Sequence, residues 1–318
     1  MVAISIYGAG QLGSAVGELL RVNPRYELAG PFTRSERELA LESGADVVII
    51  ATTTRLSDVA PDIETAVSSG SNVLVSAEEA AYPWVVDAAQ ADRLDELARG
   101  RGVTISGTGV NPGLLFDGLV LTLLGAAPRD CTIHVRRVVD ISGFGPTVLR
   151  RIGVGSHPEE FERAVAEGRI LGHAGFPQSM AIVAAALGLE IGAINKSLGA
   201  VYADSDIDLP GRFTVHAGES AGVDQTYTAI VSGRPWFVCH FYGHVALDRV
   251  GKEPTDDIDL THKRRPYQSL KLRPGLKAQA GSQNMTANSV ERVLAARPGW
   301  VTLAELAPAF PSPLGSRA

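Results

Sequence analysis

Residues 2–21 read VAISIYGAGQLGSAVGELLR, and this stretch decides the fold. The apolar run at its start predicts a β-strand, and the spaced leucines at its end predict a helix. The turn between them has the spacing G-x-G-x-x-G and comprises Gly8, Gly10, Gln11, Leu12 and Gly13. Between a strand and a helix, such glycines allow a tight turn, the approach of a pyrophosphate and close helix packing. The stretch therefore predicts a dinucleotide-binding turn.

Strands and helices continue to alternate through the first third of the chain. Further strands are expected at 26–32, 46–51, 72–76 and 103–106, and helices at 59–68 and 84–99. Continuous apolar strands separated by helices are typical of a parallel sheet with right-handed crossovers. We therefore expect an α/β fold that begins with a Rossmann-type dinucleotide-binding domain over residues 1–125.

The pattern changes after residue 125. Runs rich in Val, Thr, Tyr and Phe lie close together at 131–142, 198–209, 212–219, 223–232 and 236–247. Strands with such short connections favour an antiparallel sheet. Helices are expected after Ser156 and from Pro177 to about Gly188. We expect a second, α+β domain over residues 126–281, built on an antiparallel sheet and used for substrate binding and dimerisation.

The composition excludes several classes of protein. The chain has 318 residues, which suits two domains, and a net charge of −6, which disfavours nucleic acid as a partner. Cys131 and Cys239 alone cannot form a disulfide framework or a thiolate zinc site. The apolar helix candidate near residue 180 is too short to span a bilayer, and the N-terminus lacks a basic leader. We expect a cytoplasmic protein without a membrane partner.

The end of the second strand bears on cofactor choice. NAD-binding domains place an acidic residue about 20 residues after the glycine turn. Here the sequence has Thr33, Arg34 and Ser35, a guanidinium between two hydroxyls, which suits a 2′-phosphate. We expect NADP as cofactor, with NADPH preferred and NAD possible. Glu36 lies nearby, and Arg34 could instead be a solvated loop arginine.

Ligands of an open parallel sheet bind beyond the carboxyl ends of its strands. At those ends the residues expected to contact the cofactor are Thr52, Thr53, Ser76 and Gly109. The threonines could equally cap the following helix. Glu78 and Glu79 follow another strand end, where a carboxylate could orient an amine or the nicotinamide ribose, or simply begin a helix.

The stretch SGTGVNPG, residues 106–113, is a turn stiffened by glycines and a proline. Asn111 precedes the proline, which pushes its backbone toward extended geometry. Its amide has a donor and an acceptor, so it could hold a carbonyl, an imine or the cofactor carboxamide. The alternative is an ordinary Asn-Pro-Gly turn.

The other histidines suggest one further candidate. His173 lies between glycines before a predicted helix and is either a substrate-site residue or a hydrogen-bonded core histidine. His240 and His244 have an even spacing that places them on one strand face. No third ligand accompanies them, so no metal site is expected.

These motifs resemble those of the 2,4-diaminopentanoate dehydrogenase family, which contains the native amine dehydrogenases and is related to dihydrodipicolinate reductase. The resemblance covers nearly the whole chain. It includes GAGQLG, VSAEEAAYPW at 75–84, SGTGVNPG, the stretch PEEFERAVAEGRILGHAGFPQSMAIVAAALG at 158–188, and residues 273–306. It implies an NAD(P)-dependent oxidoreductase of C–N bonds, oxidising an amine or reducing an imine formed from a ketone and ammonia. It also implies a homodimer and a C-terminal part, residues 282–318, that returns to the first domain.

The chain departs from that pattern at several points. It lacks the His-His pair and lysine of dihydrodipicolinate reductases, so that reaction is not expected. Native amine dehydrogenases use an active-site glutamate, and the turn with Asn111 has none, which leaves Glu78, Glu79 or no carboxylate at all. Gln178 and Gln283 stand where relatives often have acidic residues, which favours an apolar ketone, amine or cyclic imine. Two alternatives remain open, an NADPH-dependent reductase of a carbonyl or cyclic imine and a non-catalytic NADP-binding protein.

Overall fold

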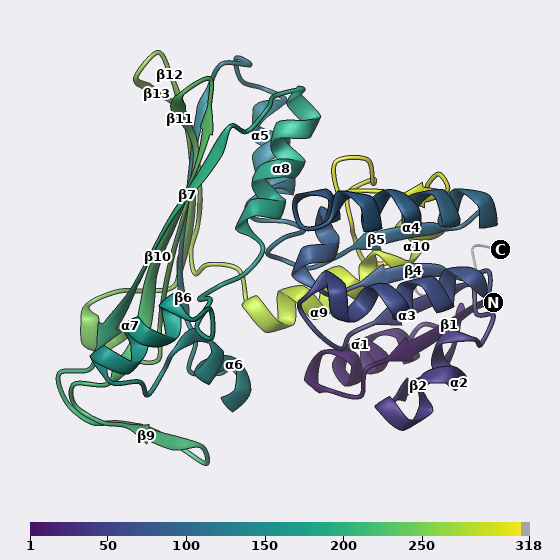
Figure 1. The fold of residues 1–318 in the computed structure, drawn as a ribbon, viewed down its shortest axis with the longest axis horizontal. Helices are drawn as coiled ribbons and strands as arrows, with labels where there is room; N and C mark the ends of the chain where they lie inside the picture. Colours follow the sequence, from purple (N-terminus) through teal and green to yellow (C-terminus); the bar gives the residue numbers. More distant parts are fainter. Residues whose placement is uncertain (313–318) are drawn as a thin grey trace. The chain divides into compact units, whose positions relative to one another are not determined.

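The computed structural model describes residues 1–312 and divides the chain into two units. Unit 1 comprises residues 1–121, 177–186 and 278–318, and unit 2 comprises residues 122–176 and 187–277 (Figure 1). The boundaries expected at 125 and 281 differ by a few residues from these. The larger difference is residues 177–186, which we expected in the second domain and which make their contacts within unit 1.

Unit 1 is built on a six-stranded parallel sheet. The strand order is β14-β5-β4-β3-β1-β2. Its strands are β1 (Val2–Tyr7), β2 (Tyr26–Phe32), β3 (Val47–Ile50), β4 (Asn72–Val75), β5 (Thr104–Gly107) and β14 (Gly299–Trp300). This confirms the expected Rossmann-like α/β arrangement. In this order the chain turns from one side of β1 to the other between β2 and β3, so the topological switch point lies at the carboxyl ends of β1 and β3.

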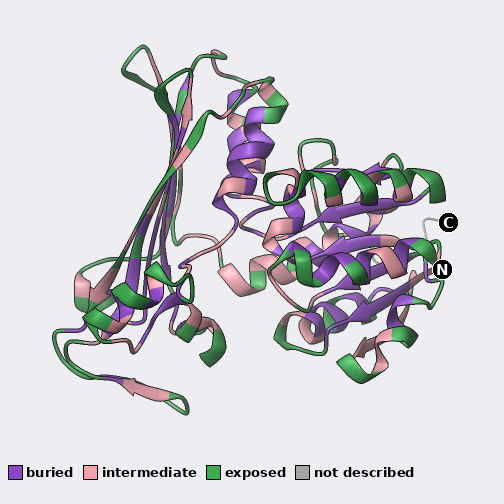
Figure 2. Cartoon of the chain, viewed as in Figure 1, coloured by how far each residue is buried: buried purple, intermediate pink, exposed green. Residues whose placement is uncertain are grey.

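Two helical layers cover the sheet because alternate strand residues point to opposite faces. Ile4, Ile6, Val47 and Ile49 pack in one core with α1 (Gln11–Arg21), α9 (Ala278–Asn288) and α10 (Val290–Leu294). Val48, Ile50, Val73 and Val75 pack in the other with α2 (Arg37–Leu41), α3 (Leu56–Ser68) and α4 (Ala88–Arg101). Buried strands under partly exposed helices are visible in Figure 2. Unit 1 also holds most of α8 (Phe176–Leu187) and the start of α5 (Gly118–Leu124).

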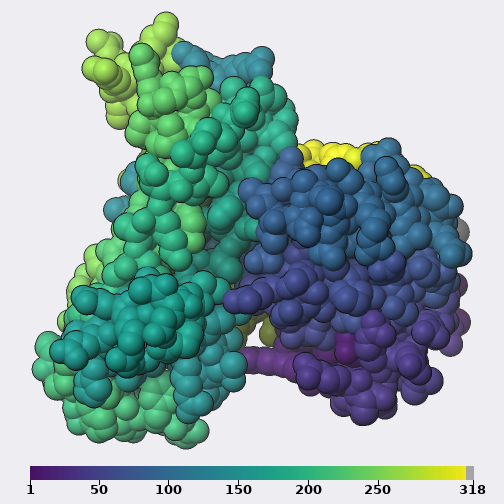
Figure 3. Space-filling view, viewed as in Figure 1, coloured from purple at the N-terminus to yellow at the C-terminus, as the bar shows by residue number. Residues whose placement is uncertain are grey.

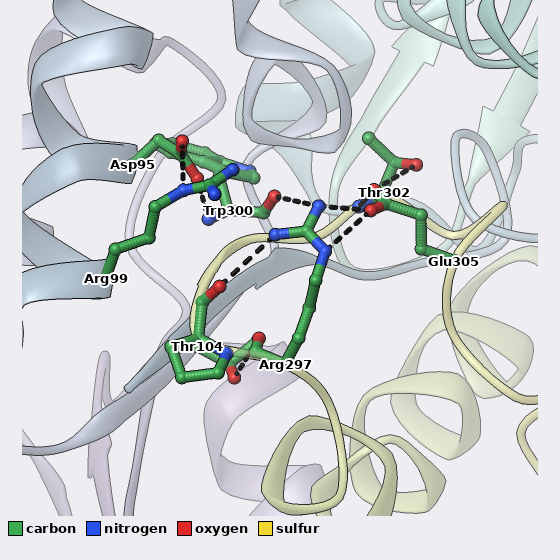
Figure 4. Close-up of polar contacts among 8 residues, drawn as sticks. Asp95, Arg99, Thr104, Arg297, Trp300, Thr302 and Glu305 are labelled. Atoms are coloured by element: carbon green, nitrogen blue, oxygen red, sulfur yellow. Dashed lines mark hydrogen bonds and ion pairs between the residues drawn. The ribbon is translucent and has the colours of Figure 1, made fainter. Parts of the chain in front are cut away.

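The C-terminal segment is joined to α4 by a hydrogen bond from the Trp300 backbone to Asp95, and ion pairs lie on both sides of it (Figure 4). Asp95 on α4 accepts hydrogen bonds from the Trp300 backbone nitrogen at 2.6 Å and from Arg99 at 2.8 Å. Arg297 pairs with Glu305, whose other oxygen accepts from the Thr302 backbone nitrogen at 2.9 Å. In the space-filling view this yellow segment emerges beside the blue surface of unit 1 (Figure 3). Since these charges are paired with one another, we assign the surrounding pocket of about 340 Å³ a structural role.

Unit 2 is built on a second six-stranded sheet, in the order β13-β12-β6-β11-β10-β7. Its strands are β6 (Thr132–Asp140), β7 (Ala193–Tyr202), β10 (Ser220–Val231), β11 (Arg234–His244), β12 (Thr255–His262) and β13 (Arg265–Leu272). The small pair β8 (Ile207–Leu209) and β9 (Phe213–Val215) and the helices α6 (Pro146–Ile152) and α7 (Pro158–Ala166) complete the unit.

The sheet is largely antiparallel, as expected, with one parallel pair, β6 and β11, which makes it mixed. The hairpin of β12 and β13 was not expected from the sequence. Its two-residue turn, Lys263 and Arg264, has positive φ angles of 48° and 64°, as tight hairpins require.

The two faces of this sheet differ. The register places Val135, Phe241 and Val223, all buried, on one face. The opposite face is mixed: it carries the polar side chains of His134, Arg136, His240 and Asp224 beside the apolar side chains of Val138, Val238 and Tyr242. Within residues 1–312, no helix is both long and apolar enough to cross a bilayer.

Candidate cofactor and active site

The turn after β1 has the shape that its glycines predict. A Cβ on Gly8, whose φ is +123°, would lie 2.3 Å from the Ala51 carbonyl oxygen, and one on Gly13 would lie 1.9 Å from the Gly8 oxygen. A Cβ on Gly10 would meet no atom within 4 Å. Two glycines are therefore required by close packing, whereas the third leaves open space beside the start of α1.

That open space suits an anion. No side chain caps the first turn of α1, so its backbone N–H groups and the positive end of the helix dipole are directed outward. The turn also lies at the switch point between β1 and β3, where ligands of such sheets bind. The residues present thus fit the pyrophosphate of a dinucleotide.

The turn after β2 is more ambiguous than its sequence indicated. Arg34 is exposed, as a residue for a 2′-phosphate should be. Thr33, however, donates hydrogen bonds to Glu36 from its backbone nitrogen at 3.0 Å and its hydroxyl at 2.6 Å, and Ser35 lies 3.0 Å from that hydroxyl. These bonds lower the pKa of Glu36. A carboxylate therefore engages the Thr33 hydroxyl, one of the two that we expected to help hold a phosphate, and Ser35 bonds to that same hydroxyl.

A cavity of about 150 Å³ lies at the carboxyl ends of β4 and β5 in unit 1. Five of the residues expected at the site line it: Leu12, Ser76, Glu78, Gly109 and Asn111. Its other lining residues are Ala77, Ala81, Thr108, Val110, Pro112, Ser282 and Thr286. The glycine turn, two strand ends and helix α9 thus contribute to one cavity.

Backbone packing explains why two distant turns meet here. A Cβ on Gly107 would lie 2.5 Å from the Ala81 backbone nitrogen, so the end of β5 sits directly against the short 3-10 turn Glu78–Ala81. The Thr108 backbone nitrogen donates to the Val75 carbonyl at 2.9 Å. As a result Glu78 and Asn111 line the same cavity.

Asn111 carries an unsatisfied group. Its side-chain oxygen Oδ1 is buried and has no hydrogen-bond partner among residues 1–312. Leaving a buried acceptor unpaired costs about 1–3 kcal/mol, so such an atom calls for a donor. A carboxamide, an amine or an iminium group supplies one, which fits both the nicotinamide end of a cofactor and a nitrogen-containing substrate.

Glu78 and Glu79, equivalent in the sequence, have different surroundings. The carboxylate of Glu79 accepts a hydrogen bond at 2.7 Å from the backbone nitrogen of Leu56, the first residue of α3. It therefore caps that helix. Glu78 is half-buried and lines the cavity. The geometry thus places Glu79 at the start of a helix and Glu78 at the cavity.

The threonines after β3 do not line the cavity. Thr53 donates a hydrogen bond to Asp58 at 3.2 Å, within the first turn of α3, and Thr52 is exposed. Thr53 thus has the capping environment that we considered as the alternative. His173 belongs to unit 2.

The surroundings of His173 are those of a core histidine. Its ring lies 5.0 Å from the ring of Phe176 and 4.9 Å from that of Phe241, and Nδ1 donates to the Ala174 carbonyl at 2.5 Å. Gln225 accepts a hydrogen bond from its backbone nitrogen at 2.8 Å. Burial, helped by Arg137, lowers the pKa of His173 to about 3, so the ring is neutral at physiological pH. Among residues 1–312 no cluster of side chains is suited to a metal ion.

Sequence reasoning missed the contribution of Ser282 and Thr286 on α9. They are four residues apart and so share one helix face. A Cβ on Gly281 would lie 2.7 Å from a methyl group of Val110, so α9 approaches the Asn111 turn closely. The small residues at helical spacing could have indicated a helix face that approaches another segment closely, but we predicted only a helix there.

Comparisons with known proteins identify the relatives of this chain. Residues 114–313 match the 2,4-diaminopentanoate dehydrogenase C-terminal domain. The chain is 30% identical to a 2,4-diaminopentanoate dehydrogenase of Acetoanaerobium sticklandii, over 95% of this chain and 85% of that protein.

Solved structures share the fold. An amine dehydrogenase of Mycobacterium smegmatis has a TM-score of 0.84 at 20% identity, covering 98% of this chain and 97% of that one. A probable dehydrogenase of Thermotoga maritima has a TM-score of 0.56 at 12% identity, covering 96% and 92%. Together with the sequence matches, these findings show that the chain belongs to the 2,4-diaminopentanoate dehydrogenase family of oxidoreductases.

Proposed function

We propose that the protein is an NADP-dependent oxidoreductase of C–N bonds that interconverts a primary amine with a ketone and ammonia. The observation that carries this proposal is the cavity beside the glycine turn, which combines the carboxylate of Glu78 with the unpaired acceptor of Asn111. A site for an amine nitrogen needs such a pair, because the nitrogen is cationic and carries N–H donors at neutral pH.

The residues that would hold the cofactor follow the geometry of unit 1. The start of α1 and Gly10 take the pyrophosphate, Arg34 takes the 2′-phosphate, and Leu12 and Gly109 border the nicotinamide end. When bound, the cofactor accepts or donates a hydride at its nicotinamide ring. Thr52, Thr53 and Ser76 remain proposed neighbours of the nucleotide.

Glu78 and Asn111 have distinct tasks in this reaction. Glu78 pairs with the ammonium group, and accepts a proton as the carbon loses its hydride and becomes the carbon of an imine. Asn111 orients either the nitrogen or the nicotinamide carboxamide through its free acceptor. Water then adds to the imine, and ammonia leaves with the formation of the ketone. In reverse, Glu78 returns the proton.

The names of two relatives support a substrate that contains nitrogen. The relative from A. sticklandii is named for 2,4-diaminopentanoate, and the structure from M. smegmatis is that of an amine dehydrogenase. Both names refer to chemistry at a carbon that bears nitrogen. For this chain we propose a small amine, ketone or imine as substrate.

A substrate panel tests the proposal. Purified protein is incubated with primary amines, including 2,4-diaminopentanoate, and NADP⁺ or NAD⁺, and with ketones and NADPH with and without ammonium, while absorbance reports the cofactor. We expect ketone reduction only with ammonium present. Turnover without ammonium would instead assign a carbonyl reductase, and NADPH binding without turnover across the panel would indicate a non-catalytic protein.

We also propose a cytoplasmic homodimer. Cys131 and Cys239 are buried and form no disulfide among residues 1–312, which suits a reducing compartment. The face of the unit 2 sheet that carries His134 and Asp224 also carries Val138, so we propose it as a self-complementary interface of polar and apolar side chains. Light scattering at micromolar concentration that gave the mass of one chain would contradict the dimer.

A further inference from the structure

A buried carboxylate lies just behind the Asn111 turn. Asp117 is fully buried, and its Oδ2 accepts hydrogen bonds from the Gly113 backbone nitrogen at 2.9 Å and the Ser179 hydroxyl at 2.8 Å. Its Oδ1 accepts from the Gly118 backbone nitrogen at 2.7 Å. Burial raises the pKa of Asp117, while these hydrogen bonds oppose the rise by stabilising its charged form. Burying the Asp117 carboxylate therefore costs free energy, and the donors that stabilise it are all neutral.

One of those bonds fixes the turn that lines the cavity. Gly113 has a φ of +131°, and a Cβ there would lie 2.0 Å from the Gly109 carbonyl oxygen. The backbone therefore doubles back on itself between Gly109 and Gly113, and Asp117 holds the N–H group at the closing point. Asn111 stands at the centre of this closed turn and lines the cavity, and its side-chain oxygen is buried without a hydrogen-bond partner among residues 1–312.

The other bond reaches a separate element. Ser179 lies in the first turn of α8 and is almost completely buried. Its hydroxyl connects α8 to the same carboxylate oxygen that holds Gly113. Neither Asp117 nor Ser179 is among the described residues that line the cavity. Any effect they have on the site must therefore pass through the turn.

We propose that Asp117 and Ser179 form a positioning pair that holds the Gly109–Gly113 turn in the shape that directs Asn111 to the nicotinamide end of the cofactor. This inference rests on the proposed function, because it assumes that a nicotinamide cofactor occupies the cavity. Loss of the Ser179 hydroxyl leaves Asp117 buried with one donor fewer, so the carboxylate shifts and releases the turn. The pyrophosphate region at Gly10 is unaffected.

Ser179→Ala tests the pair, with Ser71→Ala as a matched control. Ser71 is also fully buried in unit 1, but its hydroxyl has no hydrogen-bond partner among the described residues. Two ligands are titrated: NADPH, followed by its fluorescence, and 2′-phospho-ADP-ribose, which lacks nicotinamide. We expect Ser179→Ala to weaken NADPH roughly ten-fold and reduce its fluorescence enhancement, with the binding of 2′-phospho-ADP-ribose unchanged. Ser71→Ala should match the wild type for both ligands.

A second variant covers the case in which Ser179→Ala does not fold. Asp117→Asn keeps one oxygen acceptor, replaces the other with an amide, and should show the same selective loss of NADPH. Equal weakening of both ligands, or a variant that matches Ser71→Ala, overturns the positioning role. If the wild type binds neither NADPH nor NADH, the proposed function fails instead, so the two failures are distinguishable.

Discussion

Polar side chains lie at the carboxyl end of the unit 1 sheet and also on or beside the face of the unit 2 sheet that buries Phe241. Their surroundings differ. At the first, Asn111 keeps an unpaired acceptor and Arg34 is exposed. At the second, His173 is sandwiched between rings and made neutral by burial, and Gln225 bonds to the backbone around it. Polar groups without a hydrogen-bond partner in the protein indicate a binding site, whereas polar groups with such partners are typical of a core. Substitutions should therefore impair activity in the first region and stability in the second.

The largest effect is expected at Glu78. Glu78→Gln removes the charge that pairs with an ammonium group and the group that accepts its proton, so kcat should fall about 10²- to 10⁴-fold. Steady-state kinetics on the best substrate of the panel measures this. Glu79→Gln is the matched control, because glutamine keeps an oxygen to accept the bond from Leu56 and should remain near wild type. Equal kcat losses in both variants would remove the distinction between them.

Arg34 should affect one cofactor only. Arg34→Ala removes a charge-assisted contact to a 2′-phosphate and should raise the KM for NADPH about ten- to hundred-fold, leaving that for NADH nearly unchanged. Glu36→Gln should act in the opposite sense, because it removes the negative charge beside Thr33. A wild type that uses both cofactors equally would contradict the preference for NADPH.

His173 offers a test of the second region through pH. The folded-state pKa of about 3 lies below the unfolded value near 6.5, so the unfolded chain binds the proton first as pH falls. Its contribution to stability is complete above about pH 6.5 and is lost as pH falls toward 3. Between pH 7 and 5 the wild type should lose about 2 kcal/mol more unfolding free energy than His173→Gln. Denaturant unfolding measures it, with the exposed His157→Gln expected to follow the wild type.

The smallest effect is expected at Glu79. This residue lies at the carboxyl end of the unit 1 sheet, but its substitution should impair stability rather than activity. Glu79→Ala removes the acceptor at the start of α3 and should lower the unfolding free energy by about 1 kcal/mol, as loss of a helix cap does. Activity per folded molecule should stay close to that of the wild type. A large loss of kcat without loss of stability would place Glu79 in the site and reverse our assignment.

The glycine turn could be predicted because its glycine spacing and the flanking strand and helix form a pattern within residues 2–21. Gly13 is required by its contact with the nearby Gly8 carbonyl oxygen, whereas the contact of Gly8 with Ala51 is evident only from the structure. The parallel sheet of unit 1 could likewise be predicted from local patterns. The roles of Glu78 and Glu79 could not be separated, because they depend on where the start of α3 lies in space.

The missed hairpin of unit 2 has a different cause. β12 contains Asp256, Asp257 and Asp259, a residue type that strands usually exclude. Asp256 and Asp257 are nonetheless buried, because Arg137 lies 3.6 Å from the first and Arg136 lies 2.5 Å from the second. Those arginines lie on β6, more than a hundred residues earlier, so the sequence around β12 does not indicate that its aspartates are paired. The contributions of Ser282 and Thr286 to the cavity were missed because their spacing shows only that they share a helix face, not which turn that face approaches.

The return of the chain to unit 1 has a consequence for the order of folding. In synthesis from the N-terminus, all of unit 2 leaves the ribosome before α9, α10 and β14 do. Until then β5 has an open edge, and the sheet face with Ile4 and Ile6 lacks Val290 and Val293. Closure must wait for contacts such as that of Thr104 with the Arg297 carbonyl, 193 residues apart. The domain that begins the polypeptide is therefore the last to be finished, and the nascent chain must keep its cofactor domain incomplete throughout the synthesis of unit 2.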